Sequence, residues 1–300
     1  MLKNQTRKLG AHVSTAGGVD KAIERAAKIG ANCMQIFSGS PRVWQRPNLD
    51  LIDAHKICAT QQQLAVELIF THALYLVNLA SENPDLVKKS TNALAFDLRF
   101  DSKIKGAGVV VHLGSHMGRG WEAIKEQVLR QISSLINDAP HDSHFLIENS
   151  AGQNGKIGSD LAEIKWLINE LKSKQVGWCL DSCHAFASGY HLGDPKQQPM
   201  LKDNPKQKNL RVHDIFAEIK NLDLAPSLKL IHLNDSRDIF GSGADRHQNI
   251  GEGFIPPADL CYFLHHNLFV DVPLILEVPG MDGKSGPDAE NINRVKKILE

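Results

Sequence analysis

Val109-Val110-Val111-His112 is a short run of β-branched residues that ends in a histidine, and the same plan recurs along the chain. Five further apolar runs also end in a side chain that can bind a metal ion. They are Phe70-Thr71-His72, Leu146-Ile147-Glu148, Trp178-Cys179-Leu180-Asp181, Leu230-Ile231-His232 and Leu274-Ile275-Leu276-Glu277. Imidazole and carboxylate groups are costly to bury without a partner, so their repetition at strand ends indicates a shared site.

Helical patterns separate the predicted strands. Eight strands are expected over residues 9–14, 33–37, 66–71, 109–112, 144–148, 177–181, 229–233 and 273–278. Helices are expected over residues 19–29, 51–64, 84–105 (broken near its end), 123–136 and 161–171. Strands that alternate with helices favour parallel pairing with right-handed crossovers, and eight such units close a barrel. The sequence therefore predicts an α/β fold, a single (β/α)8 TIM barrel that spans residues 1–300 as one domain.

In such a barrel the chemistry lies at the C-terminal face of the strands, on the loops that follow them. Stretches rich in Gly, Pro and polar residues follow several predicted strands, over residues 38–47, 114–120, 188–205 and 235–254. Residues 193–208 are expected to form a long surface loop.

The overall composition limits the partners. Lys plus Arg and Asp plus Glu number 34 each, so no global charge attracts nucleic acid, and any positive potential for DNA must be local. The stretch from Met1 to Lys8 lacks an apolar run, and nothing approaches a membrane span of about 20 apolar residues. We therefore expect neither a secretion signal nor a membrane partner. Five cysteines without a C-x-x-C pair favour reduced thiols and a cytoplasmic location.

Three further candidate metal ligands, His184, Asp245 and His247, lie in loops. With the six strand-end residues they make five histidines and four carboxylates, a set that suits zinc and, to a lesser degree, manganese or iron. Three or four donors per ion would accommodate two or three ions. Cys183 would be a thiolate ligand or a small buried thiol, and the second interpretation is favoured.

A lone histidine at a strand end is more often structural than a ligand. Most of the other histidines are therefore expected to be structural or solvent-facing: His12, His116, His141, His144, His213, His265 and His266. Nine donors phased to the same end of a predicted barrel are much harder to explain by chance.

With these donors in place, the chain resembles the endonuclease IV family of zinc-dependent apurinic/apyrimidinic endonucleases. The matching segments follow one another in family order over nearly the whole chain. They are Gly10-Ala11-His12-Val13-Ser14 with 16–18, Ile147-Glu148-Asn149 with 151–153, the run 180–190, His232-Leu233-Asn234-Asp235-Ser236, Asp245-Arg246-His247 with 251–253, and 274–277.

The resemblance implies three zinc ions (Zn2+) at the mouth of the barrel. The first would be bound by His72, His112 and Glu148. Glu148 would bridge to a second ion, held also by Asp181, His232 and Glu277. The third would be bound by His184, Asp245 and His247.

The resemblance also implies a hydrolase of the deoxyribonuclease IV type that acts in base-excision repair. It would cut double-stranded DNA 5′ to an abasic site, leaving a 3′-hydroxyl and a 5′-deoxyribose phosphate, and would trim blocked 3′ ends. Zinc lowers the pKa of bound water to about 7, and Glu148 would orient this water and accept its proton.

Recognition of DNA must come from the loops. Arg42, Tyr75 and Leu76 match positions at which the family pushes side chains into the duplex, where they replace stacking lost on kinking. Trp44, in the same loop as Arg42, suits a DNA contact or loop packing equally well. We expect the protein to act as a monomer.

Two other functions remain open. A metal-dependent sugar isomerase or epimerase would use the same barrel, but with one or two ions, and would leave Asp245 and His247 without a role. A non-catalytic binder of damaged DNA would be expected to lack a ligand, and none of the nine is missing.

Overall fold

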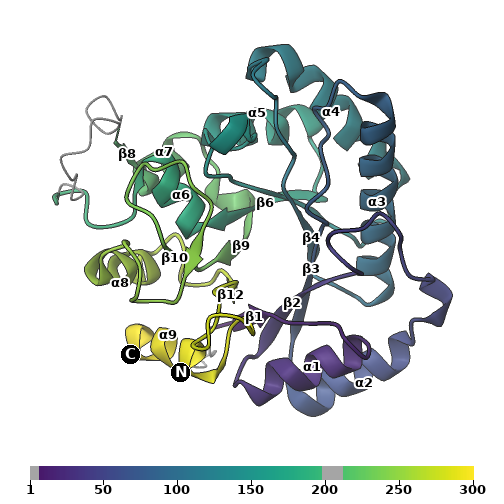
Figure 1. Cartoon of the computed structure of the whole chain (residues 1–300), viewed down its shortest axis with the longest axis horizontal. Coiled ribbons are helices and arrows are strands. Elements are labelled where there is room, and N and C mark those ends of the chain that lie inside the picture. The colour runs from purple at the N-terminus through teal and green to yellow at the C-terminus, as the bar shows by residue number, and fades with distance from the viewer. Residues whose placement is uncertain (1–6, 198–211) are drawn as a thin grey trace.

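Eight parallel strands close into a barrel in the computed structural model, which describes residues 7–197 and 212–300 (Figure 1). Neighbours follow the order β1-β12-β9-β6-β5-β4-β3-β2, and β1 pairs with β12 to complete the ring. The strands are β1 (Leu9–His12), β2 (Cys33–Phe37), β3 (Leu68–His72), β4 (Gly108–Val111), β5 (Phe145–Glu148), β6 (Val176–Asp181), β9 (Leu228–His232) and β12 (Leu274–Leu276). The predicted (β/α)8 barrel and its eight strands are confirmed.

The helices lie outside the strands, as α3 and α4 show in Figure 1. They are α1 (Val19–Lys28), α2 (Ala54–Leu64), α3 (Pro84–Lys103), α4 (Trp121–Asp138), α5 (Leu161–Leu171), α6 (Ser182–Ser188), α7 (Ile215–Asn221), α8 (Pro257–His265) and α9 (Ala289–Leu299). Two small ladders lie among the loops, formed by β7 (Tyr190–His191) with β8 (His213–Asp214) and by β10 (Asp235–Ser236) with β11 (His247–Gln248). Within the described ranges, no helix is long and apolar enough to cross a membrane.

The helix expected over residues 84–105 differs from the prediction, because it runs without a break from Pro84 to Lys103. Asn83 caps its first turn by accepting from the backbone N–H groups of Asp85 and Leu86. The chain turns only after this helix, where Lys105 adopts a left-handed conformation with φ of 54°. The predicted surface loop at 193–208 lies mostly outside the described residues.

Inside the barrel, one residue from each strand contributes to a single apolar layer. Seven of these are buried side chains: Cys33, Phe70, Val110, Leu146, Cys179, Leu230 and Ile275. The eighth position, on β1, is Gly10, where a Cβ atom would lie 1.9 Å from the carbonyl oxygen of Cys33. Only glycine allows β1 and β2 to approach this closely.

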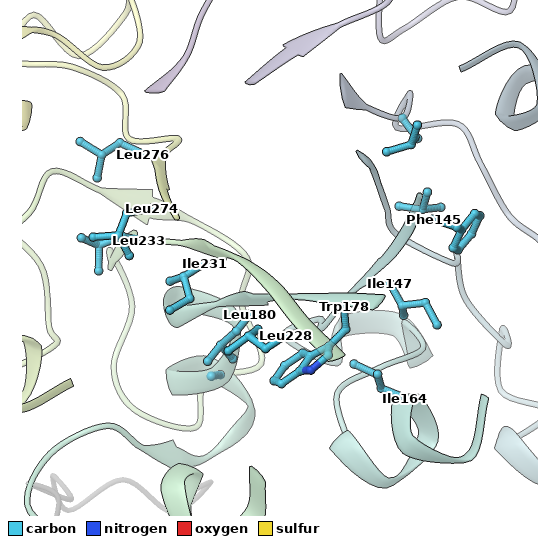
Figure 2. Packing of buried hydrophobic residues seen from close by; sticks show 14 of the residues in the cluster. Phe145, Ile147, Ile164, Trp178, Leu180, Leu228, Ile231, Leu233, Leu274 and Leu276 are labelled. Carbon is cyan, nitrogen blue, oxygen red and sulfur yellow. The ribbon is translucent and has the colours of Figure 1, made fainter. Parts of the chain in front are cut away.

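Residues on the outer side of the strands form the second and larger part of the core. Ile147 of β5 and Trp178 of β6 point toward Ile164 of α5 (Figure 2). The indole N–H of Trp178 donates to the carbonyl of Leu224 at 2.9 Å, so this large side chain is buried with its polar atom satisfied.

Candidate metal centre

The strand geometry explains why six of the nine candidate ligands lie in one layer. Alternate residues of a strand point to the same face, so the next inward position lies two residues beyond each interior residue. These eight positions, from β1 to β12 along the chain, are His12, Gln35, His72, His112, Glu148, Asp181, His232 and Glu277. An apolar layer therefore supports a second layer made entirely of polar side chains at the C-terminal mouth.

All nine predicted ligands come together, in three groups whose donor atoms lie within 4.8 Å of one another. The first group is His72, His112 and Glu148. The second is Glu148, Asp181, His232 and Glu277, so Glu148 belongs to both. The third is His184, Asp245 and His247. Six come from strands or the residue directly after a strand. The third group was predicted to lie in loops, but the structure places only Asp245 there, because His184 lies in α6 and His247 begins β11.

Local hydrogen bonds place the residues of the third group. Asp181 caps α6, since its Oδ1 accepts from the backbone N–H of His184 at 2.7 Å. His247 begins β11, which pairs with β10. The carboxylate of Asp235 in β10 holds the end of this hairpin by accepting from the N–H groups of Gly251, Gly253 and Ile255, each at 3.0 Å.

Several donor atoms approach one another without forming hydrogen bonds. Glu148 Oε2 lies 3.3 Å from His72 Nε2 and 3.2 Å from His112 Nε2, yet it is buried and has no hydrogen-bond partner. His184 Nε2, 3.0 Å from Asp245 Oδ1, is also without a hydrogen bond, as is His247 Nε2, 3.6 Å from the same oxygen. Two ligand atoms of a tetrahedral zinc ion are about 3.3 Å apart, given bonds of about 2.0–2.2 Å. The residues present therefore fit metal ions in these groups.

The second ring nitrogen of three of these histidines is held by a carbonyl oxygen. The Nδ1 of His72 contacts the carbonyl of Ala73 at 2.7 Å, and that of His184 contacts the carbonyl of Asn149 at 3.0 Å. The Nδ1 of His247 lies 3.3 Å from the carbonyl of Glu277. An N–H on Nδ1 leaves Nε2 as the acceptor that faces the centre, which is the arrangement found around metal-bound histidines.

Gln35 and His12 complete the ring and were missed by the sequence analysis. Gln35 Oε1 contacts His232 Nε2 at 2.8 Å, while Gln35 Nε2 donates to Glu277 Oε1 at 2.6 Å. His12 Nδ1 lies 3.2 Å from the same Glu277 oxygen. His12 is therefore part of the site, although the sequence analysis grouped it with histidines that are mostly structural or solvent-facing. The signal that could have found both residues is their inward position at the C-terminal half of β1 and β2.

Asn234 is another residue that the sequence analysis missed. Its Nδ2 donates to Asp181 Oδ2 at 2.7 Å, and its Oδ1 accepts from the backbone N–H of Glu277 at 2.8 Å. Asn234 therefore ties the ends of β6 and β12 together across the barrel mouth.

Carboxylates and histidines of the centre shift one another's pKa values. Burial would raise the pKa of Glu148, but His112 and His232 outweigh it and hold this pKa well below its usual value. Burial likewise opposes ionisation of Asp245, yet His184 and His247 keep its pKa low. Burial would lower the pKa of His184, but Asp181 and Asp245 raise it to about 10. Glu148 and Asp245 are thus ionised at neutral pH and require cations nearby.

An open cavity of about 480 Å³ lies over the centre. The polar side chains that line it are His12, His72, His112, His184, Asp245, His247 and Glu277. Its other lining residues are Phe37, Tyr75, Val278, Pro279, Gly286 and Pro287. Tyr75 is 61% exposed, and its ring lies edge-on to that of Phe37 at 5.3 Å. Leu76 is 37% exposed and Arg42 is exposed. The N–H of Tyr75 donates to the carbonyl of Pro41 at 3.1 Å, so the two predicted DNA-contacting loops lie side by side at this mouth.

Two further side chains complete the comparison with the sequence analysis. Trp44 packs against the hydrophobic core, which favours its structural interpretation. Cys183 Sγ lies near Asp181 and His247, but burial raises the pKa of its thiol, which favours the buried-thiol interpretation. All five cysteines are free.

Comparisons with known proteins agree with this geometry. The sequence model of the family described as xylose isomerase-like TIM barrel matches residues 23–299. A protein of Halothermothrix orenii named "Probable endonuclease 4" is 35% identical over 292 residues, which cover 97% of this chain and 99% of that protein. A protein of Halobacterium salinarum with the same name is 35% identical, with 97% and 99% covered.

Comparison with solved structures also finds an endonuclease IV. The crystal structure of endonuclease IV from Thermus thermophilus matches with a TM-score of 0.79 and 29% identity, covering 97% of this chain and 98% of that one. A D-tagatose 3-epimerase-like protein matches with a TM-score of 0.68 but only 17% identity, covering 97% of each chain, and shows a shared fold alone.

Proposed function

This chain belongs to the endonuclease IV family within the xylose isomerase-like TIM barrels, and on that premise we propose that it repairs DNA by cutting the backbone at abasic sites. The bond broken would be the phosphodiester on the 5′ side of the abasic nucleotide, leaving a 3′-hydroxyl and a 5′-deoxyribose phosphate. The observation that carries the proposal is the convergence of nine nitrogen and oxygen donors in three groups beneath an open cavity.

The metal centre of the proposed enzyme would hold three zinc ions. Their ligands would be the three groups described above, with Glu148 common to the first two. Zinc is supported by the donor set, which combines imidazole and carboxylate, and by donor spacings of 3.0–3.6 Å that suit tetrahedral coordination.

The bound ions would activate a water molecule at neutral pH and neutralise charge on the phosphoryl oxygens. The protein's own residues supply the remaining chemistry. Glu148, kept ionised by His112 and His232, accepts the proton of the attacking water. Gln35 holds His232 and Glu277 in place by one hydrogen bond to each, so these two groups keep their orientation while substrate enters.

Recognition of the lesion rests on Arg42, Tyr75 and Leu76. Tyr75 lines the cavity, and all three side chains are exposed on two loops that are hydrogen-bonded to each other. There they can enter a kinked duplex and replace the stacking lost at the missing base. Blocked 3′ ends, which need little distortion, would be trimmed by the same centre.

We also propose that residues 1–300 act as one domain, and that the enzyme is a cytoplasmic monomer. Equilibrium sedimentation with and without a lesion duplex tests the monomer.

A nicking assay combined with metal analysis tests the proposed function. The substrate is a duplex with one abasic-site analogue, and an undamaged duplex of the same sequence is the control. The proposal predicts a single nick 5′ to the lesion and three zinc ions per chain. One or two manganese or magnesium ions and no nick would instead indicate the sugar isomerase or epimerase chemistry. Tight binding to the lesion with no nick, at full zinc, would indicate a binding protein.

A further inference from the structure

The two carboxylate oxygens of Asp245 face different partners. Oδ1 faces the centre, 3.0 Å from His184 Nε2 and 3.6 Å from His247 Nε2. Oδ2 faces the other way and accepts a hydrogen bond from Lys156 Nζ at 3.0 Å. Lys156 lies 89 residues earlier in the chain, in the segment between β5 and α5, and is not among the predicted site residues.

Two of the other carboxylates of the centre accept hydrogen bonds from neutral side-chain amides. Asn234 donates to Asp181 at 2.7 Å, and Gln35 donates to Glu277 at 2.6 Å. Among the residues that the structure describes, Lys156 is the side chain that holds Oδ2 of Asp245, and it is the one lysine or arginine that bonds directly to a member of the three groups.

The backbone around Lys156 is fixed on both sides by the loop that follows β4. The N–H of His116 donates to the carbonyl of Gly155 at 2.9 Å, and the N–H of Ile157 donates to the carbonyl of Gly114 at 3.0 Å. The carbonyl of Lys156 itself accepts from Ser150 Oγ at 3.2 Å. The backbone of Lys156 is therefore already ordered, and binding Asp245 costs only the conformational entropy of the lysine side chain.

In the part of the chain that the structure describes, Asp245 has no comparable support from its own segment. It lies in the long connection between β10 and β11, and its side chain remains 24% exposed. A carboxylate in such a place can turn either oxygen, or both, toward a metal ion. A hydrogen bond to one oxygen leaves the other as a single, directed ligand atom, and hydrogen-bonded partners of this kind commonly raise metal affinity by about 10–100-fold.

We propose that Lys156 is a positioning residue for the third metal site: it binds Oδ2 of Asp245, directs Oδ1 toward His184 and His247, and so raises the affinity of that site for its ion. This rests on the proposed function, because it assumes that the third group binds zinc.

Two opposite effects of Lys156 can be separated by experiment. The ammonium group directs the ligand, but it also repels a divalent ion nearby. If orientation of the Asp245 carboxylate dominates, removal of the Lys156 charge weakens zinc binding at the third group. If charge repulsion dominates, the same change strengthens zinc binding there.

The test compares zinc affinity in the wild type, Lys156→Met and Lys156→Arg. Methionine keeps most of the unbranched stem but removes the charge and the donors, whereas arginine keeps both. The control is Lys125→Met, since Lys125 also pairs with a carboxylate, Glu122 at 2.5 Å, but lies within α4 away from the centre. Zinc per chain is measured against a graded series of chelator concentrations, with circular dichroism as the check on folding.

The expected result is that Lys156→Met holds two ions like the wild type and binds the third about 10–100-fold more weakly. Lys156→Arg recovers part of this loss, and Lys125→Met shows none. Excess zinc should restore the nicking rate of Lys156→Met to within a few-fold of the wild type, because the defect is in occupancy.

Unchanged or tighter binding of the third ion in Lys156→Met overturns the inference. If zinc binding is unchanged while DNA affinity falls and the salt slope drops by about one, Lys156 contacts a phosphate instead, and the positioning role is wrong. A wild-type protein that binds fewer than three zinc ions overturns the proposed function itself, and this inference with it.

Discussion

Glu148 is the carboxylate shared by two of the three donor groups. Its Oε2 lies between His72 and His112, and its Oε1 contacts His232 Nδ1 at 2.9 Å. Replacing this one side chain therefore changes two groups at once. Among the described residues, no other candidate ligand belongs to both the first and the second group.

Glu148→Gln should lower nicking by several orders of magnitude, because an amide is a poor zinc ligand and cannot accept the proton of water. Zinc per chain should also fall, while circular dichroism stays close to that of the wild type. Glu170→Gln, an exposed change on α5, serves as the control. Full zinc and near wild-type turnover in Glu148→Gln would show that this carboxylate has no bridging role.

At the scale of elements, α3 is held on the barrel by two buried carboxyl groups. Asp97 Oδ1 accepts from Ser38 Oγ at 2.5 Å, and Asp101 Oδ1 accepts from Thr71 Oγ1 at 2.9 Å. Burial, joined by the nearby Asp142, raises the pKa of Asp101 from 3.8 to about 7, although the hydrogen bond from Thr71 opposes this. The helix thus carries an acid that the folded protein prefers to keep protonated.

This raised pKa makes stability depend on pH. The folded chain binds the proton of Asp101 more tightly than the unfolded chain, so the free energy of unfolding falls as pH rises from about 4 to about 7. Asp101→Asn cannot ionise and should lose this dependence. At pH 8 it should be more stable than the wild type by up to a few kcal/mol, relative to the difference at pH 5.

Urea unfolding at the two pH values measures this difference, with the exposed Asp138→Asn as the control. An equal stability difference at pH 5 and pH 8 would mean that Asp101 is ionised at a normal pKa in the folded protein.

The loops after β2 and β3 form the second element with a testable role. Truncating Arg42 and Tyr75 together to alanine should weaken binding to an abasic duplex by at least tenfold, because the kinked DNA loses its wedges. Zinc content should not change, because neither side chain belongs to the three donor groups. Cleavage of a small phosphodiester should fall much less, since no duplex has to be deformed.

The matched control for this pair is Arg130→Ala with Val270→Ala. Arg130 is exposed on α4, and Val270 is 42% exposed in the segment before β12, at the opposite end of the barrel from the metal centre. Equal losses on duplex and small substrate in the Arg42 and Tyr75 variant would mean that these side chains support the barrel mouth.

The sequence predicts elements best where one local pattern decides them. Runs such as Val109 to Val111 are buried on both faces, so they are read directly as strands of a parallel sheet. Helix α6 is not predicted, because it begins at Ser182 directly after its cap Asp181, with no loop signal between strand and helix. The helix expected over residues 51–64 begins later than predicted, because Leu49–Leu51 forms a separate turn and Asp53 caps α2.

In the site, too, local sequence patterns predict some residues and miss others. The nine donors could be predicted because each lies at a strand end or beside another donor in sequence. The contacts of Gln35 with His232 and Glu277 span 197 and 242 residues, and they depend on how the strands are staggered when the barrel closes. No local pattern carries that information. Lys156 was missed for the same reason, since its partner is 89 residues away.

For the molecule as a whole, the metal ions should contribute to stability as well as to chemistry. Four carboxylates converge at the barrel mouth, and cations that bind only the folded chain stabilise it by mass action. A chelator at pH 7.5 should remove zinc slowly, and at pH 5.5 faster, because imidazole and carboxylate groups bind metal only when deprotonated, and acid competes with the metal for them.

Zinc content, nicking and the midpoint of thermal unfolding are measured on the same samples over time. Nicking should fall together with zinc and return when zinc is added back, and the stripped protein should unfold at a lower temperature. A stripped protein that nicks at the original rate would rule out metal-dependent cleavage.

The ring of strands closes where the first meets the last, since Leu9 of β1 pairs with Leu274 of β12. This has a consequence for synthesis on the ribosome. Glu277, the partner of Gln35 and His12, follows the other eight donors in the chain and is therefore translated after all of them. A nascent or prematurely terminated chain that stops before β12 carries eight of the nine donors but has neither a closed ring nor the carboxylate that completes the second group. The proposed cleavage of DNA therefore cannot begin before the ribosome has passed β12.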